Sequence, residues 1–410
     1  MHRAAPWAAT ACVIIAGALA GCSRPPPSMA ACLNEAASAQ ARIDACTAAM
    51  REGARGDTLA DAYRDRGDAY AEAGDANRAV QDLSQAIRLN ANDDAAWSSR
   101  AAARATLGEL AGARDDYAQA LNIRPSAETY VARASVDDAA HDYAAAIVDA
   151  SRAIDLHPDW ANAWSARGYA YLGKGEYEVA LADFASALRI SPQFMSAVDG
   201  RAAAFRQKHD YAAAIAACND AIKADPKDSS ALACRADTYD AEGDYAEALT
   251  DFDQAVAVDA TSAWIYLDRS GVNLDAGNGA AAIADADKGL SLEPKDPAAL
   301  NAACWARALN NTALADALAD CQRSLAMRPH DAETLDSRAM VYFRQGRLQD
   351  ALAGYNAALA ADNTLAPSRF MRGVIERRLG DAAVAQADEF AAVKADPTVV
   401  TKYAKYGIAP

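Results

Sequence analysis

The stretch ANAWSARGYAYLGKGEYEVALADFASALRISP, residues 161–192, decides the fold. Its first half carries large and small side chains at helical spacing up to Gly173, where glycine interrupts the pattern. A second helical pattern follows, with Ala180 and Phe184 on its inner face, and Pro192 ends it. The stretch therefore predicts two helices that fold back on each other through a short turn.

The same pattern returns along most of the chain of 410 residues. The counterparts of Pro192 are spaced 33 to 35 residues apart, at Ala91, Pro125, Pro158, Pro192, Pro226, Ala260, Pro294, Pro329, Asn363 and Pro397. A nearly fixed period of this length indicates that one structural unit is stacked many times. Ten such units run from Ala60 to Pro397.

Two positions of the unit hold small residues throughout. In the first helix they are Gly67, Ala101, Ala134, Gly168, Ala202, Ala236, Ser270, Cys304, Ala339 and Gly373. In the second helix they are all alanine: Ala79, Ala113, Ala146, Ala180, Ala214, Ala248, Ala282, Ala317, Ala351 and Ala385. Antiparallel helices approach closely only where facing side chains lack bulk, so we expect these positions to meet at the helix seam.

The period and the small residues closely resemble the tetratricopeptide repeat family. The resemblance implies an all-α fold, a right-handed superhelical solenoid of about ten helix-turn-helix repeats over residues 60–397. The ends of a solenoid expose apolar faces that need cover, so residues 29–59 and 398–410 are expected to form capping segments. The composition, 52% apolar but only 7% aromatic, suits thin packing of helix on helix.

Charged residues repeat with the same period. Arginines precede the small residue of the first helix, at Arg66, Arg100, Arg133, Arg167, Arg201, Arg235, Arg269, Arg338 and Arg372. Aspartates recur in the second helix, at Asp82, Asp116, Asp149, Asp183, Asp251, Asp285, Asp320 and Asp388. An unpaired charge near a packing seam is costly, so we expect a ladder of structural ion pairs. The alternative, a basic binding stripe, would leave the aspartates without a role.

The N-terminal residues have the pattern of a targeting segment. Basic residues precede an apolar run that is short for a membrane span and typical of a signal peptide, residues 1–21. The sequence Leu19-Ala20-Gly21-Cys22 resembles the lipobox of bacterial lipoproteins, which implies lipidation of Cys22. Ser23 follows the cysteine, and by resemblance to Gram-negative sorting this indicates the outer membrane. Residues 22–28 would then be a lipidated, proline-rich tether; an ordinary secretory signal is the alternative.

Of the eight cysteines, Cys12 belongs to the predicted signal peptide and Cys22 to the lipobox. The other six fall into three pairs, Cys32 with Cys46, Cys218 with Cys234, and Cys304 with Cys321. Their separations are close to half a repeat, which places the members of each pair on adjacent antiparallel helices. In an oxidising periplasm these pairs are expected to form disulfides. The alternative is that they are small buried thiols.

The sequence offers no constellation of residues for catalysis, and we expect no enzyme, no metal and no cofactor. The histidines at 141, 157, 209 and 330 fall near turns and are far apart. Phosphate-loop, zinc-protease and calcium-loop motifs are absent from the sequence. A formal charge of -16 would repel a phosphate backbone, so nucleic acid is not an expected partner.

Function is therefore expected on the surface. In the family, positions 2, 5, 9 and 12 of each first helix line a concave groove. Here the later repeats place large apolar groups and acids there or alongside, and the predicted peptide-binding groove is Trp264, Leu267, Leu274, Trp305, Met340, Phe343, Phe370, Asp237, Asp240 and Asp268. Such a surface suits an extended or helical peptide with apolar and basic side chains. The alternative is that several of these residues pack between helices.

The sequence thus predicts a lipoprotein that is anchored to the outer membrane only by its lipid and faces the periplasm. We expect it to act as an adaptor or scaffold in cell-envelope assembly, binding protein or peptide ligands of the envelope. A structural organiser that works through edge contacts, with no groove ligand, is the second hypothesis. An enzyme of unrecognised type is the third.

Overall fold

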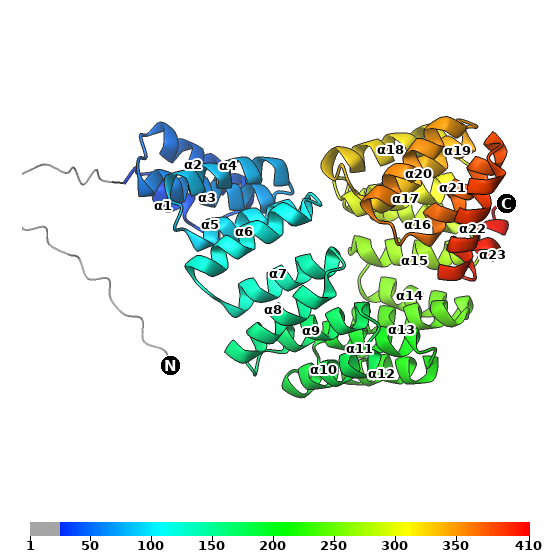
Figure 1. Ribbon diagram of the computed structural model, residues 1–410. Helices are drawn as coiled ribbons and strands as arrows, with labels where there is room; N and C mark the ends of the chain where they lie inside the picture. Colours follow the sequence, from blue (N-terminus) through cyan, green and yellow to red (C-terminus); the bar gives the residue numbers. More distant parts are fainter. Residues whose placement is uncertain (1–24) are drawn as a thin grey trace, which may run out of the picture.

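The computed structural model describes residues 25–410, and every regular element in that range is a helix (Figure 1). The predicted signal peptide and Cys22 lie outside the described residues. Two helices, α1 (Met29–Cys32) and α2 (Ala39–Arg51), precede the repeats, and α23 (Val399–Ala404) follows them. Between Pro25 and Pro410, none of the helices combines the length and the hydrophobicity that crossing a bilayer would require.

Ten helix pairs form the repeats, as the sequence predicts. The first helices are α3 (Asp57–Glu72), α5 (Asp94–Thr106), α7 (Ala127–Ala139), α9 (Ala161–Gly173), α11 (Met195–Gln207), α13 (Ser229–Glu242), α15 (Ala263–Asp275), α17 (Pro297–Leu309), α19 (Ala332–Arg344) and α21 (Ala366–Leu379). The second helices are α4 (Ala76–Leu89), α6 (Leu110–Ile123), α8 (Tyr143–Leu156), α10 (Tyr177–Ile190), α12 (Tyr211–Ala224), α14 (Tyr245–Val258), α16 (Gly279–Leu292), α18 (Leu314–Met327), α20 (Leu348–Ala361) and α22 (Ala382–Ala395). The predicted all-α solenoid is confirmed.

The turn within each repeat needs a left-handed residue. Glycine supplies it in most repeats, as at Gly175 with φ of 81°. His141 and His209 take the same place with φ of 58° and 56°, which explains why these histidines fall in turns. The next residue can cap the second helix: the Asp142 side chain accepts a hydrogen bond from the Ala145 N–H at the start of α8.

Small residues at the seam allow the two helices to touch. A Cβ added to Gly168 would lie 2.7 Å from Cε1 of Phe184, whose side chain is fully buried. Neighbouring repeats meet as closely, because a Cβ on Gly200 would lie 2.3 Å from the same atom. The predicted steric role of the small positions is therefore confirmed in the repeat formed by residues 161–192.

The charged ladder is a set of ion pairs within repeats. Seven arginines bind the aspartate 16 residues later, in the pairs Arg66–Asp82, Arg100–Asp116, Arg133–Asp149, Arg167–Asp183, Arg235–Asp251, Arg269–Asp285 and Arg372–Asp388. Several of these guanidinium groups also reach back 16 residues into the preceding repeat, as Arg100 does by donating from Nη1 to Ser84 Oγ at 3.0 Å. Each such arginine therefore joins three helices.

The ladder has gaps where its aspartate or arginine is missing. In the repeat of Arg201 the aspartate position holds Ala217, and within the described residues Arg201 pairs with Asp220 alone, at 3.7 Å. Asp320 has no arginine 16 residues before it. It pairs instead with Arg307, which lies one helical turn further along the first helix, at 2.8 Å. Arg338 also lacks its aspartate, because Gly354 stands 16 residues later, and within residues 25–410 its buried Nε has no hydrogen-bond partner. Only in the repeat of Asp320 does a disulfide, Cys304–Cys321, join the same two helices as the missing ion pair.

All three predicted cysteine pairs are disulfides. The sulfur atoms lie 2.07 Å apart in Cys32–Cys46, 2.00 Å apart in Cys218–Cys234 and 2.06 Å apart in Cys304–Cys321. They join α1 to α2, α12 to α13, and α17 to α18.

The stacked repeats curve so that the two ends of the array face each other. In Figure 1 the blue and cyan helices α1–α6 lie opposite the yellow and orange helices α16–α20, and the green repeats form the bend between them. The turn between α7 and α8 approaches the end of α20, where Nε2 of His141 lies 3.8 Å from Oδ1 of Asp362. The first helices line the inner side of this curve.

Candidate functional site

The inner faces of α15, α17 and α19 enclose a cavity of about 470 Å³, here called the groove cavity. Its walls include Trp264, Leu267, Gly271 and Leu274, which occupy the four inner positions of α15. Asn301 and Trp305 line it from α17, and Glu333 lines it from α19. Five of the predicted groove residues therefore meet at one cavity: Trp264, Leu267, Asp268, Leu274 and Trp305.

The two tryptophans of the groove cavity are available for contact. Trp264 is 37% exposed and Trp305 is half-buried, whereas most large apolar side chains of the protein are enclosed between helices. Exposed aromatic side chains in a concave wall are typical anchor points for protein partners. This wall can therefore bind an apolar or a cationic side chain.

Acidic side chains surround these tryptophans. The groove cavity is lined by Asp268, Glu293, Asp296, Asp331 and Glu333, with Arg328 as the one basic group among its lining residues. Asp296 and Asp331 cap helices α17 and α19. Within residues 25–410, the side-chain carboxylates of Asp268, Glu293 and Glu333 make no hydrogen bond or ion pair, so they remain available to a basic ligand.

The acidic surface continues along the inner face toward α11 and α13. The pKa values of Asp268 and Asp199 are each raised to about 7. The main cause is desolvation by the groove walls, and the second is the charge of the neighbouring Asp237. Desolvation, followed by Asp275 and Asp237, raises the pKa of Asp240 to about 6. Asp268 is exposed to water on one side, so its desolvation comes from the surrounding walls rather than from complete burial.

A second, smaller cavity of about 210 Å³ adjoins the first and shares Gly271, Leu274 and Trp305 with it. Its opposite wall is formed by α23 and the residues after it, including Tyr403 and Tyr406. The residues that follow the repeats thus lie inside the groove. The structure buries Val399, Tyr403 and Ile408 there, while Val400 is only partly buried.

Three predicted groove residues are not open to a ligand. Met340 and Phe370 are fully buried and Phe343 is 6% exposed. Phe370 stacks on Tyr403 with ring centroids 5.3 Å apart, and the Arg378 guanidinium lies 4.5 Å from the centroid of the Phe343 ring. Assigning these three to a ligand-binding surface is therefore wrong for this structure, because other parts of the same chain cover them.

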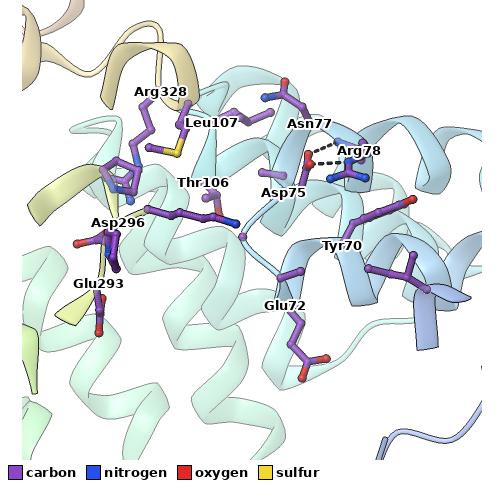
Figure 2. A pocket seen from close by; sticks show the side chains of 18 of the residues that line it. Tyr70, Glu72, Asp75, Asn77, Arg78, Thr106, Leu107, Glu293, Asp296 and Arg328 are labelled. Carbon is purple, nitrogen blue, oxygen red and sulfur yellow. Dashed lines mark hydrogen bonds and ion pairs between the residues drawn. The ribbon is translucent and has the colours of Figure 1, made fainter. Parts of the chain in front are cut away.

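A third cavity, of about 930 Å³, lies between the two ends of the array. Figure 2 shows Glu293, Asp296 and Arg328 on one wall, and Glu72, Asp75 and Asn77 on the wall from the α3–α4 turn. Glu293, Asp296, Pro297 and Arg328 line both this cavity and the groove cavity. The groove therefore continues outward to the opening between the two ends.

Sequence reasoning missed the loop acids and Arg328, and it missed the path of residues 405–410. The loop residues follow repeat boundaries, where the family pattern assigns no role. The capping segment was expected to cover the end of the array, and nothing in its own sequence showed that it would reach back to α15.

Models of the tetratricopeptide repeat match residues 161–194, 217–250, 64–128, 234–299 and 337–399, and together they cover more than half of the chain. A chain in the crystal structure of the APC/C hetero-tetramer Cut9-Hcn1 is 15% identical with a TM-score of 0.52, and the match covers 90% of this chain and 66% of that one. A tetratricopeptide repeat protein from Parabacteroides merdae is 21% identical over 60% of this chain and 97% of its own, with a TM-score of 0.46.

Among curated proteins, bacteriophage adsorption protein A of Escherichia coli K12 is 34% identical over 94 residues. The match covers 23% of this chain and spans only 10% of that relative's length. The helix pairs, the small seam residues and the matched repeats lead to one assignment: the chain belongs to the tetratricopeptide repeat family.

Proposed function

We propose that this protein is an adaptor of the bacterial cell envelope that binds basic, partly apolar protein segments in the groove formed by α15, α17 and α19. The groove cavity carries the proposal, because it places Trp264 and Trp305 among carboxylates that have no structural partner in the described residues. Aromatic walls bind apolar and cationic side chains, and the carboxylates favour lysine and arginine. The absence of a catalytic constellation in the sequence supports binding rather than catalysis.

The location is proposed from the sequence of the first 22 residues. A signal peptide followed by a lipobox-like Leu19-Ala20-Gly21-Cys22 supports a lipid anchor in the outer membrane, with the repeats facing the periplasm. The three disulfides are consistent with an oxidising compartment. Cys22→Ala should move the protein from the membrane fraction to the soluble fraction; continued sedimentation with membranes would exclude the anchor.

The groove is tested by photocrosslinking in envelopes. A photoreactive amino acid replaces Glu333, which lines the groove cavity, or Phe390, which is 72% exposed on α22. We expect a discrete adduct from position 333 that disappears when Trp264→Ala and Trp305→Ala are introduced together. Position 390 should give no such adduct, and Phe390→Ala should leave the adduct at 333 unchanged.

Two results would contradict the proposal. One is an adduct at 333 that survives the double tryptophan substitution. The other is an equal adduct at 390, which would favour a scaffold that works through its outer edges. Circular dichroism of each variant establishes that the helices are intact.

A further inference from the structure

Residues 405–410, here called the 405–410 segment, lie against the end of α15. The Tyr406 hydroxyl donates to the Leu274 carbonyl oxygen at 2.5 Å, and Lys405 Nζ donates to the Asp275 carbonyl oxygen at 2.7 Å. Leu274 and Asp275 are the last two residues of α15 and precede these partners by 132 and 130 residues. The carbonyl groups at a helix C-terminus carry partial negative charge, which favours a lysine there.

Arg344 holds the middle of the 405–410 segment. Its Nη2 donates to the carbonyl oxygens of Leu309, at 2.7 Å, and Tyr406, at 3.0 Å. Leu309 is the last residue of α17, so one guanidinium joins the segment to the end of a second groove helix. All of these contacts use main-chain carbonyl groups, which do not depend on the identity of the groove side chains.

The basic groups of this region face acids of the groove. Lys405 Nζ lies 5.3 Å from the centroid of the Tyr245 ring. Lys402 and Lys405 are close enough to Asp240 and Asp275 to interact with both carboxylates. Oδ1 of Asp240 is buried and has no hydrogen-bond partner within residues 25–410, so it can accept a bond from a basic ligand.

The fit of the segment is incomplete. The cavity of about 210 Å³ remains open between the segment and α15. Just before the segment, the Tyr403 hydroxyl of α23 is buried without a hydrogen-bond partner in the described part of the chain, which is unfavourable for a polar group. Lys405 and Gly407 remain exposed. The segment therefore occupies the groove through a few polar contacts and the buried Ile408.

We propose that the 405–410 segment is a resident ligand of the groove, and that the natural partner is a peptide segment with a basic residue beside an aromatic one, which displaces it. This inference rests on the proposed function and specifies the chemistry of the partner. The basic group takes the place of Lys405 near Asp240 and Asp275. The aromatic group takes the place of Tyr406 at the end of α15.

The wider groove explains how a free partner can compete. A tethered segment has an effective concentration in the millimolar range, so a partner must make additional contacts to displace it. The groove cavity of about 470 Å³ adjoins the segment's site and is left open by it. A partner that fills both cavities also contacts Trp264 and the free carboxylates.

The test uses a fluorescent peptide of residues 402–410, KYAKYGIAP, and the whole protein. The double variant Lys405→Ala and Tyr406→Phe loosens the resident segment but keeps Ile408. We expect this variant to bind the peptide at least tenfold more tightly than the unchanged protein. Adding Trp305→Ala should weaken that binding at least tenfold, and adding Phe390→Ala should not change it.

A second peptide tests whether the lysine and tyrosine side chains are the groups that the groove recognises. It carries Lys405→Ala and Tyr406→Ala, and we expect at least tenfold weaker binding to the double variant. A protein ending after Ala404 should bind the unchanged peptide like the double variant; if that protein does not fold, the double variant decides.

Equal binding of the peptide by the unchanged protein and the double variant, or no binding by either, would overturn the inference. Neither result affects the proposed function, because crosslinking from position 333 is measured in the unchanged protein. Conversely, position 333 could give no adduct while the peptide binds as expected. In that case the 405–410 segment would remain a ligand of the groove, and only the proposed envelope partner that displaces it would be lost.

Discussion

Arg167 binds both carboxylate oxygens of Asp183, with Nε and Nη2 each 2.8 Å from an oxygen, and Asp183 is only 4% exposed. The Trp164 ring covers the guanidinium, whose carbon lies 4.9 Å from the ring centroid. We expect Arg167→Ala to lower the free energy of unfolding by about 3 kcal/mol, because it leaves a buried carboxylate unpaired. Urea denaturation followed by circular dichroism measures the change.

Arg201 provides the matched control for Arg167. It occupies the same position of the next repeat, but within residues 25–410 its one ion pair is a 3.7 Å contact with Asp220, whose carboxylate is exposed. Arg201→Ala should therefore cost less than about 1 kcal/mol. Equal losses from the two variants would show that the ladder contributes little to stability.

Substitution of Gly168 tests the close approach of two helices. A Cβ at this position would lie 2.7 Å from Phe184, so Gly168→Ala should destabilise the protein by about 1–3 kcal/mol through overpacking. Gly271 is also helical but has nothing within 4 Å of an added Cβ, and Gly271→Ala should stabilise by up to about 1 kcal/mol. Thermal unfolding compares the two; a loss at Gly271 as large as that at Gly168 would refute the steric explanation.

The disulfide between Cys304 and Cys321 should stabilise a repeat that lacks the regular ion pair. Closing a loop of this length contributes about 3 kcal/mol in the chain-entropy account, so we expect the double variant Cys304→Ser and Cys321→Ser to lose on that order. A protein that begins after Cys22 should show no free thiol under denaturing, non-reducing conditions. Six titratable thiols in that assay would mean that the cysteines are reduced.

Asp336 should make stability depend on pH. Burial, opposed by the Ser368 hydroxyl that donates to it, raises its pKa to about 7. Between about pH 4 and pH 7 the folded protein keeps a proton that the unfolded chain has released, so stability falls as pH rises through this range. The scale is about 1.4 kcal/mol per unit of pKa shift.

Asp336→Asn should flatten this pH dependence, because the carboxamide does not ionise. The exposed Asp115→Asn in α6 is the control and should leave the curve unchanged. Chemical denaturation from pH 4 to pH 8 gives both curves. An identical slope in the Asp336→Asn variant and the parent would assign the dependence to other carboxyls.

Binding of a basic peptide in the groove should strengthen with pH. The pKa values of Asp240 and Asp268 are raised to about 6 and about 7, so both carboxyls gain charge between pH 5 and pH 8. We expect the fluorescent peptide to bind the Lys405→Ala and Tyr406→Phe variant about tenfold more tightly at pH 8 than at pH 5, with Arg206 as a fixed opposing charge nearby. Asp240→Asn should reduce this ratio, because Asp240 lies near the site of Lys405, whereas Asp115→Asn should preserve it.

The fold was predictable because its determinants repeat. The small residues, the arginines and the aspartates each appear in many copies, so one helix pair could be checked against nine others. The disulfide pairs were predictable for the same reason, since half a repeat fixes which helices are adjacent.

The groove was predictable only in part. Trp264 and Trp305 follow from their place in a repeat, because inner positions depend on helix periodicity alone. The covering of Phe370 by Tyr403 and the contact of Tyr406 with Leu274 depend on how far the whole array curves. That curvature is the accumulated effect of a small rotation between each repeat and the next. A local sequence pattern does not determine it.

The arginines that join three helices also bear on how such a chain can lengthen. Arg100 reaches 16 residues forward to Asp116 and 16 residues back to Ser84, and both distances are shorter than one period. A tandem duplication of any window one period long therefore restores both partners at every copy, wherever the window begins. The genetic breakpoints need not coincide with the ends of a helix pair, so where neighbouring repeats carry the regular arginine and aspartate, the array can grow or shrink by whole periods and keep these ion pairs.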